Sequence, residues 1–258
     1  MSTLARRLVA AYAALAYAAF AAAALWTAGF LADAAVPVTI DGGHRPPAAL
    51  ALAADTGLLL LFAGQHTVMA RRGFKRRLAR VLPPAAERST FVLAASLALL
   101  LLCWQWQPLP GPVWQLRGGG AALAWAGYGA GWLIVVATTF MVDHLDFLGL
   151  RQAGYGRAAG PPVFTERWLY TLVRHPMMSG LLVTFWATPR MTAGHLLFAA
   201  AGTAYIAVGV RFEERELRRE FGDRYRDYAR RVPALVPLPR RRPAARPGHA
   251  GSAARGDR

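Results

Sequence analysis

The sequence predicts an all-α membrane protein: a bundle of five to six membrane-spanning helices, the last one or two forming a helical hairpin, with an interfacial C-terminal helix. Three observations predict this fold. Of the 258 residues, 55% are hydrophobic, and the mean hydropathy is positive. The apolar residues form runs of about 20, the length a helix needs to cross a bilayer. Arginines gather in short segments between these runs, as they do in membrane proteins.

The first two spans are predicted at residues 8–31 and about 50–70. The first run follows Arg6 and Arg7. It is long for a signal peptide and has no clear cleavage site, so we interpret it as a retained span. The loop 32–49 between the two spans carries little positive charge.

The most basic short segment follows the second span, from Arg71 to Arg80. It predicts that this side faces the cytoplasm, because short cytoplasmic loops are rich in Lys and Arg. A third span is expected at about 89–107 and a fourth at about 120–142. Alternation of spans then returns the loop 143–173 to the basic side.

Residues 177–212 are too few for two full crossings, which need roughly 40 residues. We therefore predict a short or tilted helical hairpin that turns at Pro189, with both ends on the cytoplasmic side. Residues 211–232 show apolar and aromatic side chains at near-helical spacing, which predicts an amphipathic interfacial helix. We assign residues 1–236 to one membrane domain and 237–258, rich in Pro, Arg, Gly and Ala, to a disordered basic tail.

Composition also excludes several classes of function. The net charge of +16 is located in loops and tails without the aromatic interleaving of a nucleic-acid binder, so anionic lipid headgroups are the expected partner. The single cysteine, Cys103, rules out disulfide frameworks and cysteine-based metal sites. No HExxH spacing is present, and we predict no metal. Paired broken spans in two equivalent halves, the signature of many transporters, are also missing from the sequence.

Two histidines at span ends, His66 and His144, are candidate proton acceptors near neutral pH. Gln65, Met69 and Asp146 lie beside them in sequence and are candidate substrate contacts. Ionisable groups near membrane depth are costly and suggest function. Each of these side chains has an alternative interpretation as a polar group that reaches the membrane interface.

A third cluster combines Arg174-His175-Pro176, which begins a helix, with Glu213-Glu214 at the end of the hairpin. Pro is well suited to a first helical turn, whose free N–H groups favour an anionic ligand group. The two carboxylates suit an amine or ribose hydroxyls, or they pair with arginines of their own helix. The pattern Gly127-x-Gly129-x-Gly131 lies inside a span and indicates close helix packing.

Together, these residues resemble the motif of a known superfamily. Arg174-His175-Pro176, Gly180 and Glu213-Glu214, followed by Leu217, Phe221-Gly222, Tyr225 and Tyr228, resemble the signature of the isoprenylcysteine carboxyl methyltransferase and phospholipid methyltransferase superfamily. Further motifs, from Gln65-His66 to Gly194-His195, are similar to its nurim-like branch, and within it to the bacterial methanethiol S-methyltransferases. The similarity spans most of residues 1–237. One departure is Met178, where many superfamily members have Tyr.

The resemblance implies a bacterial inner-membrane enzyme that methylates methanethiol to dimethyl sulfide with S-adenosylmethionine. It implies cofactor contacts at Arg174, His175, Pro176, Gly180, Glu213 and Glu214, reached from the cytoplasm. Other functions stay open. The chain could methylate another thiol, an isoprenoid or a lipid. It could also be a non-catalytic nurim-like membrane protein, or a partner in nitrogen-oxide metabolism, a label that similar bacterial sequences carry.

Overall fold

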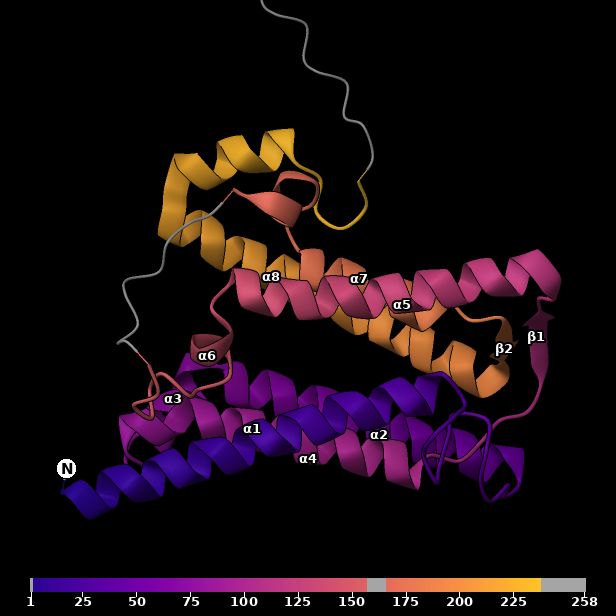
Figure 1. The fold of residues 1–258 in the computed structure, drawn as a ribbon, viewed down its shortest axis with the longest axis horizontal. Coiled ribbons are helices and arrows are strands. Elements are labelled where there is room, and N and C mark those ends of the chain that lie inside the picture. The colour runs from indigo at the N-terminus through magenta and orange to yellow at the C-terminus, as the bar shows by residue number, and fades with distance from the viewer. Residues whose placement is uncertain (1, 157–165, 238–258) are drawn as a thin grey trace, which may run out of the picture.

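The computed structural model describes residues 2–156 and 166–237, so the tail predicted at 237–258 lies outside the described residues except for Pro237. The described chain is built almost entirely of helices, which confirms the all-α prediction (Figure 1). The elements are α1 (Thr3–Leu31), α2 (Ala48–Ala70), α3 (Arg72–Leu78), α4 (Pro84–Gln105), β1 (Pro112–Gln115), α5 (Gly118–Met141), α6 (His144–Phe147), the 3-10 turn η1 (Trp168–Thr171), α7 (Pro176–Trp186), β2 (Arg190–Thr192) and α8 (Ala193–Arg231).

Five helices, α1, α2, α4, α5 and α8, are long and apolar enough to cross a membrane. The chain is thus a multi-pass membrane protein. The sixth apolar helix, α7, has 11 residues. At 1.5 Å per residue it is about 16 Å long, about half the thickness of the hydrocarbon core. The count of five to six spans is confirmed, and α7 is the helix that does not span.

The helices lie in two layers, with α1, α2 and α4 in one and α5, α7 and α8 in the other (Figure 1). A buried apolar cluster joins the layers on the side that carries β1 and β2, which we call the strand side. Its aromatic rings interlock: Phe30 lies 5.8 Å from Trp106 and 6.0 Å from Phe198, and Phe198 lies 5.3 Å from Phe185. The other side carries residues 71–80, and we call it the basic side.

The hairpin turns at Pro189, as predicted. What the sequence did not predict is the pair of short strands that fixes this turn. β2 pairs with β1 antiparallel, with Gln115 opposite Arg190, and the N–H of Leu116 donates to the carbonyl of Pro189 over 2.7 Å. The turn is therefore bonded to the loop that connects α4 and α5.

Small residues allow α5 and α7 to cross closely, which confirms the packing interpretation of the glycine pattern. A Cβ on Gly131 would lie 2.4 Å from Thr184 Oγ1 and 2.8 Å from the Gly180 carbonyl oxygen. A Cβ on Gly127 would lie 3.1 Å from the Cβ of Ala187, whereas one on Gly129 would meet nothing within 4 Å. This crossing sets the position of α7, and with it that of Arg174 and His175.

The amphipathic segment expected at 211–232 is not a separate helix. α8 continues through residue 211 and changes direction only at Gly222, whose φ of 56° and ψ of −130° are not helical. A positive φ of this kind is accessible to glycine at little steric cost. Beyond Gly222 the chain folds back (Figure 1), and Tyr225, Tyr228 and Val232 form a small buried cluster, from which the Tyr228 hydroxyl donates to the carbonyl of Tyr170 in η1.

Candidate active site

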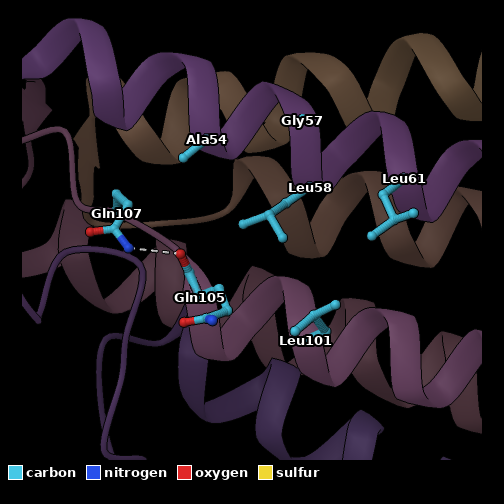
Figure 2. A pocket seen from close by; sticks show the side chains of 7 residues that line it. All are labelled: Ala54, Gly57, Leu58, Leu61, Leu101, Gln105 and Gln107. Carbon is cyan, nitrogen blue, oxygen red and sulfur yellow. Dashed lines mark hydrogen bonds between the residues drawn. The ribbon is translucent and has the colours of Figure 1, made fainter.

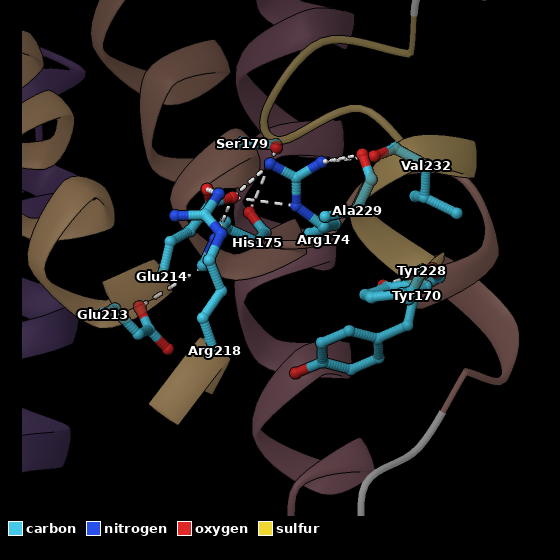
Figure 3. Close-up of polar contacts among 10 residues, drawn as sticks. All are labelled: Tyr170, Arg174, His175, Ser179, Glu213, Glu214, Arg218, Tyr228, Ala229 and Val232. Carbon is cyan, nitrogen blue, oxygen red and sulfur yellow. Dashed lines mark hydrogen bonds and ion pairs between the residues drawn. The ribbon is translucent and has the colours of Figure 1, made fainter. Parts of the chain in front are cut away.

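The start of α7 and the basic-side half of α8 meet in a cluster of charged side chains, Arg174, His175, Glu213, Glu214 and Arg218, which we call the carboxylate cluster (Figure 3). Arg174 Nε donates to Glu214 Oε1 over 2.8 Å, and its Nη2 contacts the same oxygen. Arg218 Nη2 donates to the other oxygen, Glu214 Oε2, over 2.6 Å. The Arg174 and Glu214 side chains are only 6% and 11% exposed, so both carboxylate oxygens are engaged inside the protein.

His175 lies between the two carboxylates. Its Nδ1 is 3.3 Å from Glu213 Oε2, and its Nε2 is 3.5 Å from Glu214 Oε1. The imidazole is 4% exposed, whereas the Glu213 side chain is 51% exposed. The adjacent carboxylates therefore have different surroundings. Glu214 is held by arginines, and Glu213 faces outward beside a buried histidine.

The segment that follows the bend at Gly222, which we call the C-terminal arm, lies over the start of α7. The backbone N–H groups of Arg174 and His175 donate to the carbonyls of Pro233 and Ala234, at 2.9 and 3.0 Å. Arg174 Nη1 donates to the carbonyl of Ala229 over 3.1 Å and also contacts that of Val232. Carbonyls at the end of a helix lack hydrogen-bond donors within the helix, and the Arg174 guanidinium provides those donors here. Arg174 thus joins α7, α8 and the arm through one guanidinium group.

Tyr170, in η1, lies next to this cluster. Its carbonyl accepts a hydrogen bond from Tyr228 Oη over 2.6 Å. Burial raises the pKa of the Tyr170 phenol to about 12, and the Glu213 carboxylate acts in the same direction. The phenol therefore stays neutral at physiological pH and keeps a hydroxyl that can donate to a ligand.

The second predicted group surrounds His66 on α2. His66 Nδ1 lies 2.8 Å from Tyr205 Oη on α8, and Thr67 Oγ1 lies 3.2 Å from the same oxygen. The imidazole also packs against the ring of Phe91, with 5.0 Å between centroids. Gln65 Nε2 lies 3.0 Å from the sulfur of Met69, so these two predicted substrate contacts touch each other.

His144 is engaged at both ring nitrogens. Its Nδ1 lies 2.9 Å from Thr139 Oγ1, its Nε2 lies 3.1 Å from Tyr17 Oη, and its ring stacks on Phe140 with 4.5 Å between centroids. Asp146, predicted beside it, accepts a hydrogen bond from Gln152 Nε2 over 3.0 Å. His144 thus binds α1 to the end of α5.

Arg88 connects the surroundings of the two histidines. Its Nε donates to the carbonyl of Phe147 over 2.8 Å, and its guanidinium lies over the rings of Phe91 and Phe147. Phe91 in turn touches His66. The histidine group and the carboxylate cluster do not touch, but α8 carries residues of both. Tyr205 and Glu214 are nine residues apart, about 13 Å along the helix axis and on opposite faces.

Two predicted cofactor residues have clear structural roles. Pro176 begins α7, and Gly180 lies at the α5–α7 crossing, where an added Cβ would be 2.8 Å from the Gly131 carbonyl oxygen. Sequence reasoning missed Tyr170 and Tyr205. The signal available for Tyr205 was a phenol inside an apolar run, at a position where a polar group needs a partner. Met178, which differs from the Tyr of many superfamily members, packs against the buried apolar cluster.

Two cavities lie on the strand side, away from the carboxylate cluster. A groove of about 500 Å³ lies between α2 and α4 and is lined by Ala54, Gly57, Leu58, Leu61, Leu101, Gln105 and Gln107 (Figure 2). A smaller cavity of about 150 Å³ borders the 32–47 loop and the Pro189 turn. Within residues 2–156 and 166–237, no three His, Cys, Asp or Glu side chains are grouped in a way that could hold a metal ion.

Comparison with known proteins identifies a family and several related proteins. The family model described as NnrU protein matches residues 56–229. Methanethiol S-methyltransferase 2 of Bradyrhizobium diazoefficiens is 52% identical over 229 residues, which cover 88% of each chain. Methanethiol S-methyltransferase of Mycobacterium tuberculosis is 48% identical, over 89% of this chain and 96% of that one. Human nurim is 32% identical, over 65% of this chain and 68% of its own. No solved structure matches.

Proposed function

The chain belongs to the NnrU protein family, and on that premise we propose that it transfers a methyl group from S-adenosylmethionine to methanethiol, giving dimethyl sulfide. One observation supports a methyl-donor site most directly. Arg174-His175 and Glu213-Glu214, about 40 positions apart, meet in one partly buried cluster. The acceptor is proposed from the names of relatives that share about half of the residues over nearly the whole chain.

The carboxylate cluster fits such a donor, which carries an ammonium group, a carboxylate, ribose hydroxyls and a sulfonium. Glu213 offers an exposed carboxylate for the amine or the hydroxyls, while Glu214 is already engaged. Arg218, 43% exposed, offers a cation for the ligand carboxylate. Tyr170 adds a neutral hydroxyl beside Glu213. When bound, the donor supplies an electrophilic methyl group on a positively charged sulfur.

An apolar surrounding favours this reaction. A thiolate and a sulfonium become two neutral thioethers, so opposite charges are partly neutralised in the transition state, and water would stabilise the separated ions more than the transition state. The buried face of α8 that carries Glu214 continues into Val210 and Ile206, 7% and 6% exposed. These side chains exclude water next to the carboxylate cluster. The remaining contribution of the protein is in-line placement of the two sulfur atoms.

We assign removal of the thiol proton to His66. A model thiol has a pKa of about 8.5, so most of it is protonated at neutral pH and a base increases the reactive fraction. His66 uses Nδ1 for Tyr205, and no described residue is bonded to its Nε2. His144 has partners at both nitrogens and is less suited to accept a proton.

The proposed donor site opens on the basic side. Arg71, the first residue of the basic segment, places its guanidinium 4.7 Å from the ring of Phe212, the neighbour of Glu213. By the positive-inside rule this side faces the cytoplasm, where the methyl donor is made. We therefore propose an inner-membrane enzyme that takes its donor from the cytoplasm.

One observation favours a second candidate, methylation of a longer apolar thiol or a lipid. The groove between α2 and α4 has leucine walls and two glutamines at one end, which suits an alkyl chain with a polar head (Figure 2). A long acceptor needs such a lateral opening, and methanethiol does not. The two candidates therefore differ in the chain length of the preferred acceptor.

The experiment measures headspace dimethyl sulfide by gas chromatography, in cells given methanethiol that express the wild type, the Glu213→Gln variant or an empty vector. Dimethyl sulfide from the wild type, with less from Glu213→Gln and none from the empty vector, supports the proposal. Absence of product, from protein shown to be in the membrane fraction, contradicts it. Purified enzyme with labelled donor then compares methanethiol with thiols of increasing chain length, and a preference for long thiols supports the second candidate.

A further inference from the structure

We propose that Tyr205 is a positioning residue that holds His66 in the tautomer needed for proton transfer, with its own hydroxyl directed by Thr67. The inference rests on the proposed function. It starts from one oxygen atom, Tyr205 Oη, which has two polar neighbours on α2: His66 Nδ1 at 2.8 Å and Thr67 Oγ1 at 3.2 Å.

The single proton of a phenol allows two arrangements at this oxygen. In the first, His66 Nδ1–H donates to Tyr205, and Tyr205 donates to Thr67. In the second, Thr67 donates to Tyr205, and Tyr205 donates to an unprotonated Nδ1. A neutral imidazole carries one proton, so the first arrangement leaves Nε2 with a lone pair and the second places the proton there.

Only the first arrangement lets Nε2 accept the thiol proton. The S–H bond breaks, its electron pair stays on sulfur as thiolate, and the proton forms the Nε2–H bond. The imidazole becomes an imidazolium that still donates from Nδ1 to Tyr205. Every hydrogen bond around Tyr205 keeps its direction during this step, so proton transfer requires no reorganisation at that oxygen.

Thr67 makes this arrangement possible. Its hydroxyl gives the Tyr205 proton an acceptor other than His66, which leaves the phenol oxygen free to accept from Nδ1–H. The rings of Phe62 and Phe91, at 5.7 and 5.0 Å from that of His66, limit rotation of the imidazole. The second tyrosine–histidine pair, Tyr17 with His144, has no such free nitrogen and provides a natural comparison.

Tyr205 also connects the proton acceptor to the carboxylate cluster. It stands on α8 eight residues before Glu213, about 12 Å along the axis. A donor held at the carboxylate cluster must span that distance to reach a thiol at His66. Because the same helix carries both, the position of His66 relative to the donor depends on the Tyr205 contact.

The test measures kcat/KM for methanethiol from neutral pH to above the pKa of the thiol, using purified Tyr205→Phe, Thr67→Val and Tyr17→Phe enzymes. We expect Tyr205→Phe to be about tenfold slower near neutral pH, the loss of about one hydrogen bond. The deficit should disappear at high pH, because thiol already ionised in solution needs no base. Thr67→Val should show the same pattern at smaller amplitude, and Tyr17→Phe should not.

A deficit of Tyr205→Phe that is the same at every pH overturns the inference, because a merely structural role predicts it. So does a Tyr17→Phe variant with the same pH-dependent deficit. If Tyr205→Phe fails to fold, Thr67→Val decides, since it keeps the phenol ring and changes only the acceptor. A wild type that methylates no thiol contradicts the proposed function itself. An active wild type whose variants keep the wild-type pH profile contradicts only the role of Tyr205.

Discussion

Arg174 Nε lies 2.8 Å from Glu214 Oε1, and this contact joins two residues 40 positions apart in the sequence. Both side chains are almost completely buried, at 6% and 11% exposure. Removing one member of a buried ion pair leaves the other charge uncompensated, which destabilises proteins by about 3–5 kcal/mol. The pair therefore holds the start of α7 against α8 before any ligand binds.

We accordingly expect Glu214→Gln to lower the free energy of unfolding by about 3 kcal/mol, because the Arg174 charge loses its carboxylate. Thermal unfolding of the purified protein in detergent measures the effect. The matched control is Asp223→Asn, which breaks an ion pair with Arg226 whose side chains are 87% and 57% exposed. That change should cost less than about 0.5 kcal/mol. Equal losses in the two variants would show that burial of the Arg174 pair is not what stabilises it.

Glu213 should affect ligand binding rather than stability. Its carboxylate is half exposed beside His175, so Glu213→Gln removes a negative charge and one of two acceptor oxygens from the donor site without breaking a buried ion pair. We expect donor affinity to fall about 10- to 100-fold, the effect of one charge-assisted hydrogen bond, with the unfolding temperature nearly unchanged. Isothermal titration with S-adenosylmethionine measures it. Glu216→Gln, an exposed carboxylate on the same helix, is the control and should bind like the wild type.

His175→Ala extends this test. The imidazole contacts both carboxylates, at 3.3 and 3.5 Å, and is 4% exposed. Its removal should abolish measurable donor binding, while the protein remains in the membrane fraction because the spans are unchanged. Retained binding in the titration would count strongly against the donor site proposed here.

The spans could be predicted from the sequence because the length and polarity of apolar runs respond to one constraint, the thickness of the bilayer. The turn at Pro189 was predictable for the same reason, since 36 residues are too few for two crossings. The apparent boundary at residue 211 was misleading. Side-chain polarity changes there, but the backbone hydrogen bonds that continue the helix do not depend on side-chain polarity. The real bend, at Gly222, depends on one backbone conformation.

The composition of the candidate site was predictable, but its connections were not. The pattern Glu213-Glu214 does not reveal which carboxylate is buried, because adjacent helical residues differ by 100° and either could face α7. Arg174 was expected to bind a ligand. Its bonds to the carbonyls of Ala229 and Val232 could not be predicted, because they form only when the chain reverses direction far from Arg174 in the sequence. Tyr205 could not be assigned to His66 without knowing that α2 and α8 lie together.

The α5–α7 crossing should tolerate no side chain at Gly131. A Cβ there would approach Thr184 Oγ1 to 2.4 Å and a backbone oxygen to 2.8 Å, so Gly131→Ala should destabilise the protein by about 1–3 kcal/mol. Gly129→Ala, two residues away with nothing within 4 Å, should be neutral or slightly stabilising because alanine favours the helix. Unfolding midpoints in detergent compare the two. Equal effects would mean that the helices adjust and that the contact is not tight.

Asp41, in the loop between α1 and α2, should make stability depend on pH. Burial raises its pKa above the ordinary range, although Thr192 Oγ1 donates to it over 2.5 Å. The folded state therefore holds the proton more tightly than the unfolded state. This contribution to stability is present below the ordinary pKa of about 4 and is lost as pH rises through the raised value. Asp41→Asn cannot ionise, so its unfolding temperature should lack that decline.

Asp143 provides a control in which the dependence of stability on pH has the opposite sign. A hydrogen bond from Arg151 lowers the pKa of its carboxyl. Its contribution to stability is therefore present above the ordinary pKa and is lost as pH falls through the lowered value. Curves of unfolding temperature against pH for Asp41→Asn and Asp143→Asn should deviate from the wild type with opposite slopes. Parallel curves for all three proteins would contradict both assignments.

The two histidines should separate into a catalytic and a structural residue. His66→Gln should reduce kcat/KM near neutral pH by about 100-fold, the typical contribution of a general base, without changing donor affinity. His144→Gln should instead lower the free energy of unfolding by about 1–2 kcal/mol, because bonds to Thr139 and Tyr17 are weakened and the stack on Phe140 is lost. Rates, donor titrations and unfolding midpoints on both variants distinguish the roles. The reverse pattern, with His144→Gln stable but inactive, would make His144 the base and would remove the functional reason for the Tyr205 contact.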